Sequence, residues 1–147
     1  YAFAAHFAPQ SMEMAFKIYR DQFVPSDVLQ APYTIACVNI IVDKQSENAH
    51  LYATSMYKMF LGIFNNERKP MAAPDANWQE KCSEQELNVL QSMLSCSFIG
   101  NEEEVKATLS DFVQRMDVNE LMMTCPIYSF ENRMNSMQLA SQILVSL

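Results

Sequence analysis

The sequence predicts an α/β fold built on a parallel β-sheet, and three observations support this prediction. Short apolar segments of strand length alternate with longer amphipathic segments of helical period. The strand-like segments are apolar on both faces, which is typical of a parallel sheet covered by helices. Only 2 glycines occur in the 147 residues, and this disfavours the tight hairpins of an antiparallel sandwich or barrel. The expected order is strand, helix, strand, helix, loop, helix, helix, strand, helix.

The first half of the chain supplies two strands and two helices. Residues 1–8 form the first predicted strand, and Pro9 stands where a helix can begin. The helix that follows is indicated by apolar residues at helical spacing, namely Met12, Ala15, Phe16, Tyr19 and Phe23. Residues 32–42 are rich in strand-forming side chains and predict the second strand, and residues 47–64 predict a long helix.

Residues 65–82 break this pattern and are predicted to be a loop insert. They contain Pro70 and Pro74 and show little periodicity, and a loop of this length is often a lid or a binding segment. Trp78 is the only tryptophan of the chain. It is interpreted as an anchor that packs the loop on a neighbouring element.

The second half of the chain begins with strong helix-start signals. Ser83 with Glu86, and Asn101 with Glu104, match the capping-box pattern. Residues 97–99 between these helices are predicted to be a short extended link. The third strand is predicted at residues 120–124, between two amphipathic helices, and the first and third strands are expected at the edges of the sheet. Ser129 then begins the last helix.

Composition and charge exclude several classes of protein. Half of the residues are hydrophobic, which predicts a real core in one domain, and the net charge of −7 disfavours nucleic acids and anionic membranes. No apolar run approaches the roughly 20 residues of a membrane span. The 4 cysteines form no CxxC pair, which indicates reduced core thiols in a cytoplasmic protein.

Ligands of parallel α/β proteins bind at the carboxyl ends of the strands, and this rule selects the candidate site. It selects residues 5–7, 42–44 and 124–128. His6 stands out because an imidazole exchanges protons near neutral pH. A hydrogen-bonded core histidine is the alternative interpretation, although its place at a strand end favours function. Two isolated histidines provide no metal site.

Several segments resemble the luciferase-like monooxygenases, in the same order and at the same spacing over nearly the whole chain. Residues 1–9, YAFAAHFAP, are similar to the sixth strand of that family, and residues 19–26, YRDQFVPS, resemble its LYR…F.PS turn. Residues 97–103, SFIGNEE, resemble SFVGSPE, and residues 120–128, ELMMTCPIY, resemble DELMV…IYD. The alkanal-monooxygenase-like branch is the most similar.

The resemblance implies the fold and the chemistry of a flavin enzyme. The family is a TIM (β/α)8 barrel, and residues 1–147 would be a single partial domain containing strands six to eight with their helices. The family uses reduced flavin mononucleotide and oxygen on an aldehyde or another apolar substrate. His6 would be the catalytic residue, Ala4, Ala5 and His6 would contact the flavin, and Phe7, Cys125 and Tyr128 would line the substrate pocket.

A non-catalytic interpretation stays open beside this one. The phosphate-binding turn and first five strands of the family have no counterpart in residues 1–147, so the chain alone could be a structural or assembly module without a flavin site. Three parallel strands leave both sheet edges open, and exposed strand edges pair readily. We therefore expect a homo-oligomer, or association with the other part of a barrel.

Overall fold

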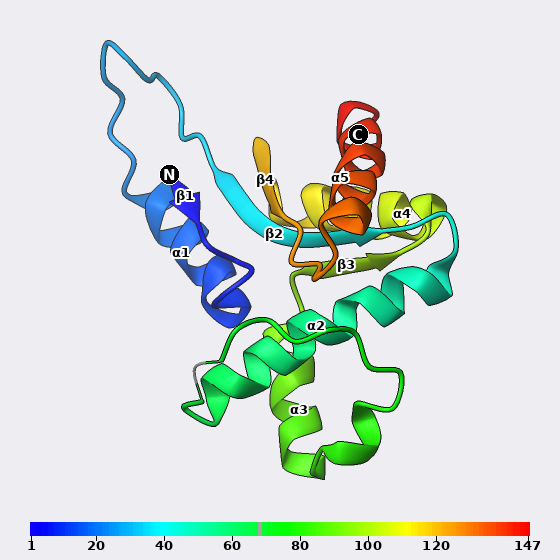
Figure 1. Ribbon diagram of the computed structural model, residues 1–147. Helices are drawn as coiled ribbons and strands as arrows, with labels where there is room; N and C mark the ends of the chain where they lie inside the picture. Colours follow the sequence, from blue (N-terminus) through cyan, green and yellow to red (C-terminus); the bar gives the residue numbers. More distant parts are fainter. Residues whose placement is uncertain (68) are drawn as a thin grey trace.

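The computed structural model describes residues 1–67 and 69–147, and it contains a four-stranded parallel sheet with helices on both faces (Figure 1). The elements in chain order are β1 (Ala2–Phe3), α1 (Pro9–Asp21), β2 (Ile35–Val42), α2 (Ser46–Phe64), the 3-10 helix η1 (Gln79–Lys81), α3 (Glu84–Met93), β3 (Ser97–Gly100), α4 (Glu102–Met116), β4 (Glu120–Thr124) and α5 (Phe130–Val145). The α/β class predicted from the sequence is confirmed.

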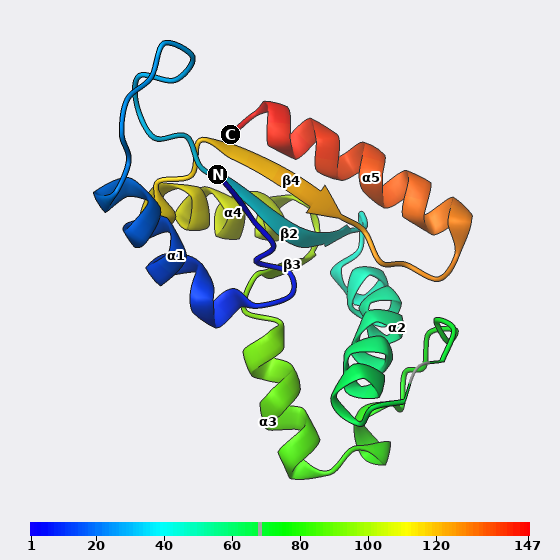
Figure 2. The same cartoon turned by 90° about the vertical axis from the view of Figure 1, so that its left-hand side faces the viewer.

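Strand β2 is the centre of the sheet and pairs with the three other strands, all in parallel. Ile35 pairs with Ala2 of β1 and with Glu120 of β4. Four residues later, Asn39 pairs with Ser97 of β3 and with Thr124 of β4. Strand β4 therefore occupies one edge of β2, while β1 and β3 follow one another along the other edge. Residues 120–124 form β4 with the predicted bounds, and this strand lies beside β2 as an edge strand of the described sheet (Figure 2).

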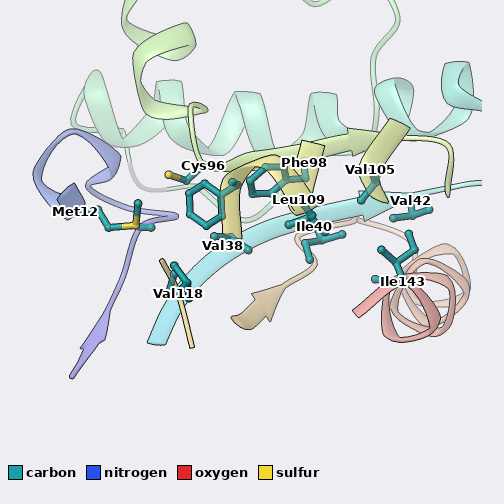
Figure 3. Packing of buried hydrophobic residues seen from close by; sticks show 14 of the residues in the cluster. Met12, Val38, Ile40, Val42, Cys96, Phe98, Val105, Leu109, Val118 and Ile143 are labelled. Atoms are coloured by element: carbon teal, nitrogen blue, oxygen red, sulfur yellow. The ribbon is translucent and has the colours of Figure 1, made fainter. Parts of the chain in front are cut away.

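The even-numbered residues of β2 face the main core. Val38, Ile40 and Val42 pack with side chains of α4 and α5, which include Leu109 and Ile143 (Figure 3). We call this side of the sheet the α4/α5 face. Helix α1 contributes Met12 and Phe16 to the same core.

The opposite side, the α2 face, is covered only in part. Ile41 is fully buried in a second core with α2, and Figure 1 shows α2 on the other side of the sheet from α4 and α5. Asn39 is 2% exposed, Cys37 is half-buried, and Met122 on β4 is 52% exposed. Helix α2 therefore covers the carboxyl end of this face, and the amino end is open.

Two of the predicted elements are corrected. The first strand was expected over residues 1–8, but β1 ends at Phe3 because the chain turns, and the backbone N–H groups of Phe7 and Ala8 bind the carbonyl of Ala4. Residues 97–99 are not a mere link, because Ser97–Gly100 pairs with the end of β2. The first error concerns a local turn, and the second concerns pairing with a distant strand.

The two predicted capping boxes are confirmed at Ser83 and Asn101. Gly100 precedes the second box with φ +155°, and a Cβ atom there would lie 2.3 Å from a carboxylate oxygen of Glu104. The same carboxylate accepts a hydrogen bond of 2.7 Å from Ser46 at the start of α2. This glycine therefore allows the starts of α2 and α4 to be joined.

The insert at residues 65–82 contains the 3-10 helix η1, and its residue 68 lies outside the described residues. Trp78 packs against Tyr57 of α2 with ring centroids 4.9 Å apart, so its predicted role as an anchor is confirmed. Among the described residues, no helix is both long and apolar enough to cross a membrane.

Candidate functional site at the carboxyl edge of the sheet

Polar groups gather where β1 and β4 end, beside the middle of β2 and the start of β3. We define the carboxyl-edge site as His6, Cys37, Asn39, Ser97 and Thr124. Asn39 is the only polar residue of β2, whose sequence is IACVNIIV. The odd-numbered positions of β2 lie on the α2 face, so Asn39 lies between the covered end and the open end of that face.

Three side chains of this site form one row of hydrogen bonds across three strands. The Thr124 hydroxyl donates to Asn39 Oδ1 at 2.7 Å. Asn39 Nδ2 donates to the Ser97 hydroxyl oxygen at 2.9 Å. Asn39 is 2% exposed, whereas Thr124 and Ser97 are half-buried. The buried amide is therefore satisfied, and both ends of the row reach the surface.

His6 is held at the same edge by two contacts to one carbonyl. Its backbone N–H donates to the Cys37 carbonyl at 2.8 Å, and its Nδ1 lies 3.3 Å from the same oxygen. A carbonyl oxygen only accepts hydrogen bonds, so Nδ1 carries the proton. In the neutral ring, Nε2 is then a free acceptor of protons or hydrogen bonds.

His6 and Ser97 attach to successive positions on one edge of β2. The Cys37 carbonyl accepts from His6, and the Asn39 N–H donates to the Cys96 carbonyl. These positions are two residues apart along the strand, or roughly 7 Å. The structure thus brings the predicted His6 close to residues that the sequence analysis did not select.

The predicted flavin contacts Ala4 and Ala5 differ in their surroundings. The Ala4 side chain is exposed, and its carbonyl accepts from the N–H groups of Phe7 and Ala8. Ala5 is fully buried in the core of the α4/α5 face. The Ala5 side chain therefore has no access to a ligand at the carboxyl edge.

The predicted substrate residues lie on both sides of β2. Phe7 is 56% exposed and contacts Phe60 of α2 edge-on, with ring centroids 6.4 Å apart. Cys125 and Tyr128 follow β4 on the other edge. Cys125 is half-buried, and burial is the main cause that raises the pKa of its thiol, while Tyr128 is 53% exposed.

A polar cleft of about 690 Å³ opens beside the carboxyl end of β2. Its walls are mostly carboxamides and carboxylates, and Lys44 is the one basic residue among the described residues that line it. Such a lining is unfavourable for a phosphate, which requires clustered cations or free backbone N–H groups. In the described part of the chain, no group of three acidic, histidine or cysteine side chains could hold a metal ion.

Thr124 lies in the segment 124–128 that the sequence analysis selected, whereas Asn39 and Ser97 were missed. One local signal was available, because a single Asn inside an apolar strand must find hydrogen-bond partners when it is buried. Its partners lie 58 and 85 residues away, and the spacing of residues along the chain does not reveal them.

Comparison with solved structures supports the fold. The chain aligns with apo-MsnO8 at a TM-score of 0.83 and 18% identity, covering 97% of this chain and 44% of that one. Monooxygenase RslO1 from Streptomyces bottropensis aligns at a TM-score of 0.52 and 14% identity, covering 99% of this chain and 40% of that one. These likenesses define the class as an α/β protein with a monooxygenase-like fold.

Comparison with known sequences shows a relationship to luciferase-like monooxygenases over part of their length. The chain is 32% identical to a luciferase-like monooxygenase of Escherichia coli K12 over 143 residues, which is 97% of this chain and 43% of that protein. It is also 35% identical to the uncharacterized protein YddN of Bacillus subtilis, over 98% of this chain and 42% of that protein. No protein-family model matches the sequence. The chain is a relative of the luciferase-like monooxygenases, and it spans less than half the length of these relatives.

Proposed function

We propose that the chain is part of a flavin-dependent monooxygenase that uses reduced flavin mononucleotide and oxygen to oxidise an aldehyde or another apolar substrate. The observation that carries this proposal is His6 at the carboxyl edge, with Nδ1 fixed by Cys37 and Nε2 free. The relationship to a luciferase-like monooxygenase supports the same chemistry.

The proposal includes a place for the chain in a larger barrel. The strands β1, β2 and β4 would be the sixth, seventh and eighth strands of a TIM barrel. Two features of the sheet support this arrangement: all strands are parallel, and the α2 face is open at its amino end, where Met122 is 52% exposed. The interior of such a barrel is filled by side chains from all strands, so the open face would be closed by the others.

The carboxyl-edge site fits one part of the cofactor. A flavin ring has an apolar edge and an edge of hydrogen-bonding groups, and the site offers both apolar and hydrogen-bonding side chains. Phe7 provides an apolar surface, while Ser97 and Thr124 provide a donor and an acceptor. The flavin phosphate does not fit, because none of the residues that define the site is cationic. The phosphate would have to be bound by groups outside the carboxyl-edge site.

In this proposal each residue of the chain has a limited role. The bound flavin would supply the oxygen chemistry, as cofactors do in such enzymes. His6 would hold or accept a proton at Nε2 beside the ring, with its orientation fixed by the Cys37 carbonyl. Phe7, Cys125 and Tyr128 would line the substrate side and exclude water, and Ala4 would contact the ring through its backbone.

Flavin titration of the chain, followed by the quenching of flavin fluorescence, tests the proposal. We expect binding in the micromolar range, and equal affinity for flavin mononucleotide and riboflavin because the phosphate has no partner. His6→Ala should weaken binding, whereas His50→Ala is the matched control, since His50 is exposed on α2. Equal affinity of the two variants would refute the role of His6.

A structural or assembly module without a flavin site is the second candidate function. It is favoured by the exposed Met122 and by β4, which pairs only with β2 in the described sheet. Such a surface is prone to pair with another strand edge or apolar face. Light scattering during size-exclusion chromatography should then show a dimer or larger species and no flavin quenching. A folded monomer of 16.8 kDa would contradict this candidate.

A further inference from the structure

The hydrogen-bond row at the carboxyl edge has a direction. Thr124 donates its only hydroxyl proton to Asn39 Oδ1, so its oxygen can only accept a hydrogen bond from a ligand. Asn39 Nδ2 donates to the Ser97 oxygen, and no acceptor in the described part of the chain takes the Ser97 proton. Ser97 therefore presents a donor, and Thr124 presents an acceptor.

The groups near Ser97 in the carboxyl-edge site are mainly hydrogen-bond acceptors. The Nε2 of His6, near the same edge of β2, is an acceptor when the ring is neutral. A carbonyl oxygen is an acceptor without a proton, so it cannot bind to His6 Nε2 or to the Thr124 oxygen. Within the carboxyl-edge site, the Ser97 hydroxyl is the strongest donor with a free proton for it, because the thiol of Cys37 is only a weak donor.

We infer that Ser97 donates a hydrogen bond to the carbonyl oxygen of the substrate, and that Asn39 and Thr124 are positioning residues that keep the Ser97 proton directed outward. This inference rests on the proposed function in one respect, since it takes an aldehyde as the substrate. It assigns the three residues distinct roles: Ser97 touches the ligand, Asn39 fixes its hydroxyl, and Thr124 fixes the orientation of the Asn39 amide.

The carbonyl stretching band of isotope-labelled octanal, measured by infrared difference spectroscopy with the whole chain and without flavin, tests the inference. Hydrogen bonding weakens a carbonyl bond, so we expect a bound band at lower wavenumber than that of octanal in an aprotic solvent. Ser97→Ala should abolish this band, and Ser97→Thr should keep it. Ser141→Ala removes a hydroxyl from the exposed surface of α5 and should also keep the band.

Asn39→Asp tests the direction of the row with little change in shape. A carboxylate only accepts, so it would draw the protons of both Thr124 and Ser97 inward and remove the free donor. We expect the shifted band to disappear although Ser97 is intact, and octanal to bind about threefold to tenfold more weakly. Asn77→Asp in the exposed insert adds the same charge and should leave the band unchanged.

Nuclear magnetic resonance of the unmodified chain supplies a measurement that needs no variant to fold. We expect one Asn39 Nδ2 proton to exchange slowly with water, because it is bound to Ser97 and the residue is buried. Fast exchange of both protons would overturn the inference. A wild-type spectrum without a shifted carbonyl band, or a Ser97→Ala spectrum that keeps it, would do the same.

The failure of this inference and the failure of the proposed function have different signatures. If flavin does not bind while the shifted octanal band is present, the cofactor assignment fails and the role of Ser97 stands. If flavin binds and depends on His6, but the band does not depend on Ser97, the inference fails and the proposed function stands.

Discussion

The amino edge and the carboxyl edge of the sheet use the same kinds of side chain for different purposes. At the amino edge, the fully buried Thr34 donates to Asn119 Oδ1 from both its backbone N–H, at 2.8 Å, and its hydroxyl, at 3.0 Å. The Thr34 carbonyl accepts from the N–H groups of Asn119 and Glu120. At the carboxyl edge, Thr124 and Asn39 bond side chain to side chain, and the row ends in half-buried hydroxyl groups.

Arg20 completes the amino edge. Its guanidinium donates to the carbonyls of Met116 and Asp117, where α4 ends and Asp117 adopts a left-handed conformation with φ 51°. These bonds satisfy carbonyls that the helix leaves free at its end. The hydrogen bonds of the amino edge involve backbone groups, so we interpret this edge as stabilising the fold. We interpret the carboxyl edge, where side-chain hydroxyl groups reach the surface, as binding a ligand.

The largest expected effect is the loss of stability in Asn119→Ala. This change leaves the N–H and the hydroxyl of Thr34 without their main partner, and a buried donor without a partner costs about 1–3 kcal/mol. Urea unfolding followed by circular dichroism should show a free energy of unfolding reduced by about this amount. The flavin affinity of the folded variant, measured without urea, should be unchanged. A weaker affinity would contradict the view that the amino edge serves stability and not binding.

Asn39→Leu should give the opposite pattern. Ser97 and Thr124 are half-buried and can bind water instead, so we expect the free energy of unfolding to change by about 1 kcal/mol or less. The flavin dissociation constant should rise several-fold, because the orientation of the two hydroxyl groups is lost. Unfolding and titration of the same preparations check this. A large loss of stability without any change in affinity would make the carboxyl edge structural as well.

Local signals in the sequence predicted much of the fold but only part of the candidate site. The capping boxes at Ser83 and Asn101 depend on residues three positions apart, so they were predicted correctly. The place of β3 beside β2 depends on pairing with a distant strand and was missed. The turn that ends β1 at Phe3 was also missed, because its backbone hydrogen bonds to the Ala4 carbonyl have no side-chain signal.

The site shows the same limit. His6 was selected because it follows a predicted strand, whereas the Asn39 row requires the register of three strands to be known. Asn119 and Thr34 are likewise 85 residues apart, so their hydrogen bonds could not be predicted from the sequence alone.

A third prediction concerns helix α2, which covers the carboxyl end of the α2 face of the sheet. Burial raises the pKa of Tyr57 to about 12, and Tyr57 lies against Trp78 of the insert. A raised pKa means that the folded state favours the protonated phenol, so its contribution to stability is complete below the pKa of about 10 in the unfolded chain. This contribution decreases as the pH rises from about 10 to about 12.

Tyr57→Phe should remove that part of the alkaline loss of stability and have little effect at neutral pH. Urea unfolding at several alkaline pH values, with both proteins measured in parallel, checks the prediction. Identical pH dependence of the two proteins would show that Tyr57 is not buried against Trp78 in solution, and would weaken the view that α2 and the insert cover this end.

The most direct test of the difference between the two edges is a flavin titration observed by nuclear magnetic resonance of the backbone amides. The account predicts that flavin mononucleotide shifts the amide signals of His6, Asn39, Ser97 and Thr124, and leaves those of Thr34 and Asn119 in place. Shifts centred on Thr34 and Asn119, or no shifts at all at saturating flavin, would contradict the assignment of the carboxyl edge as the binding site.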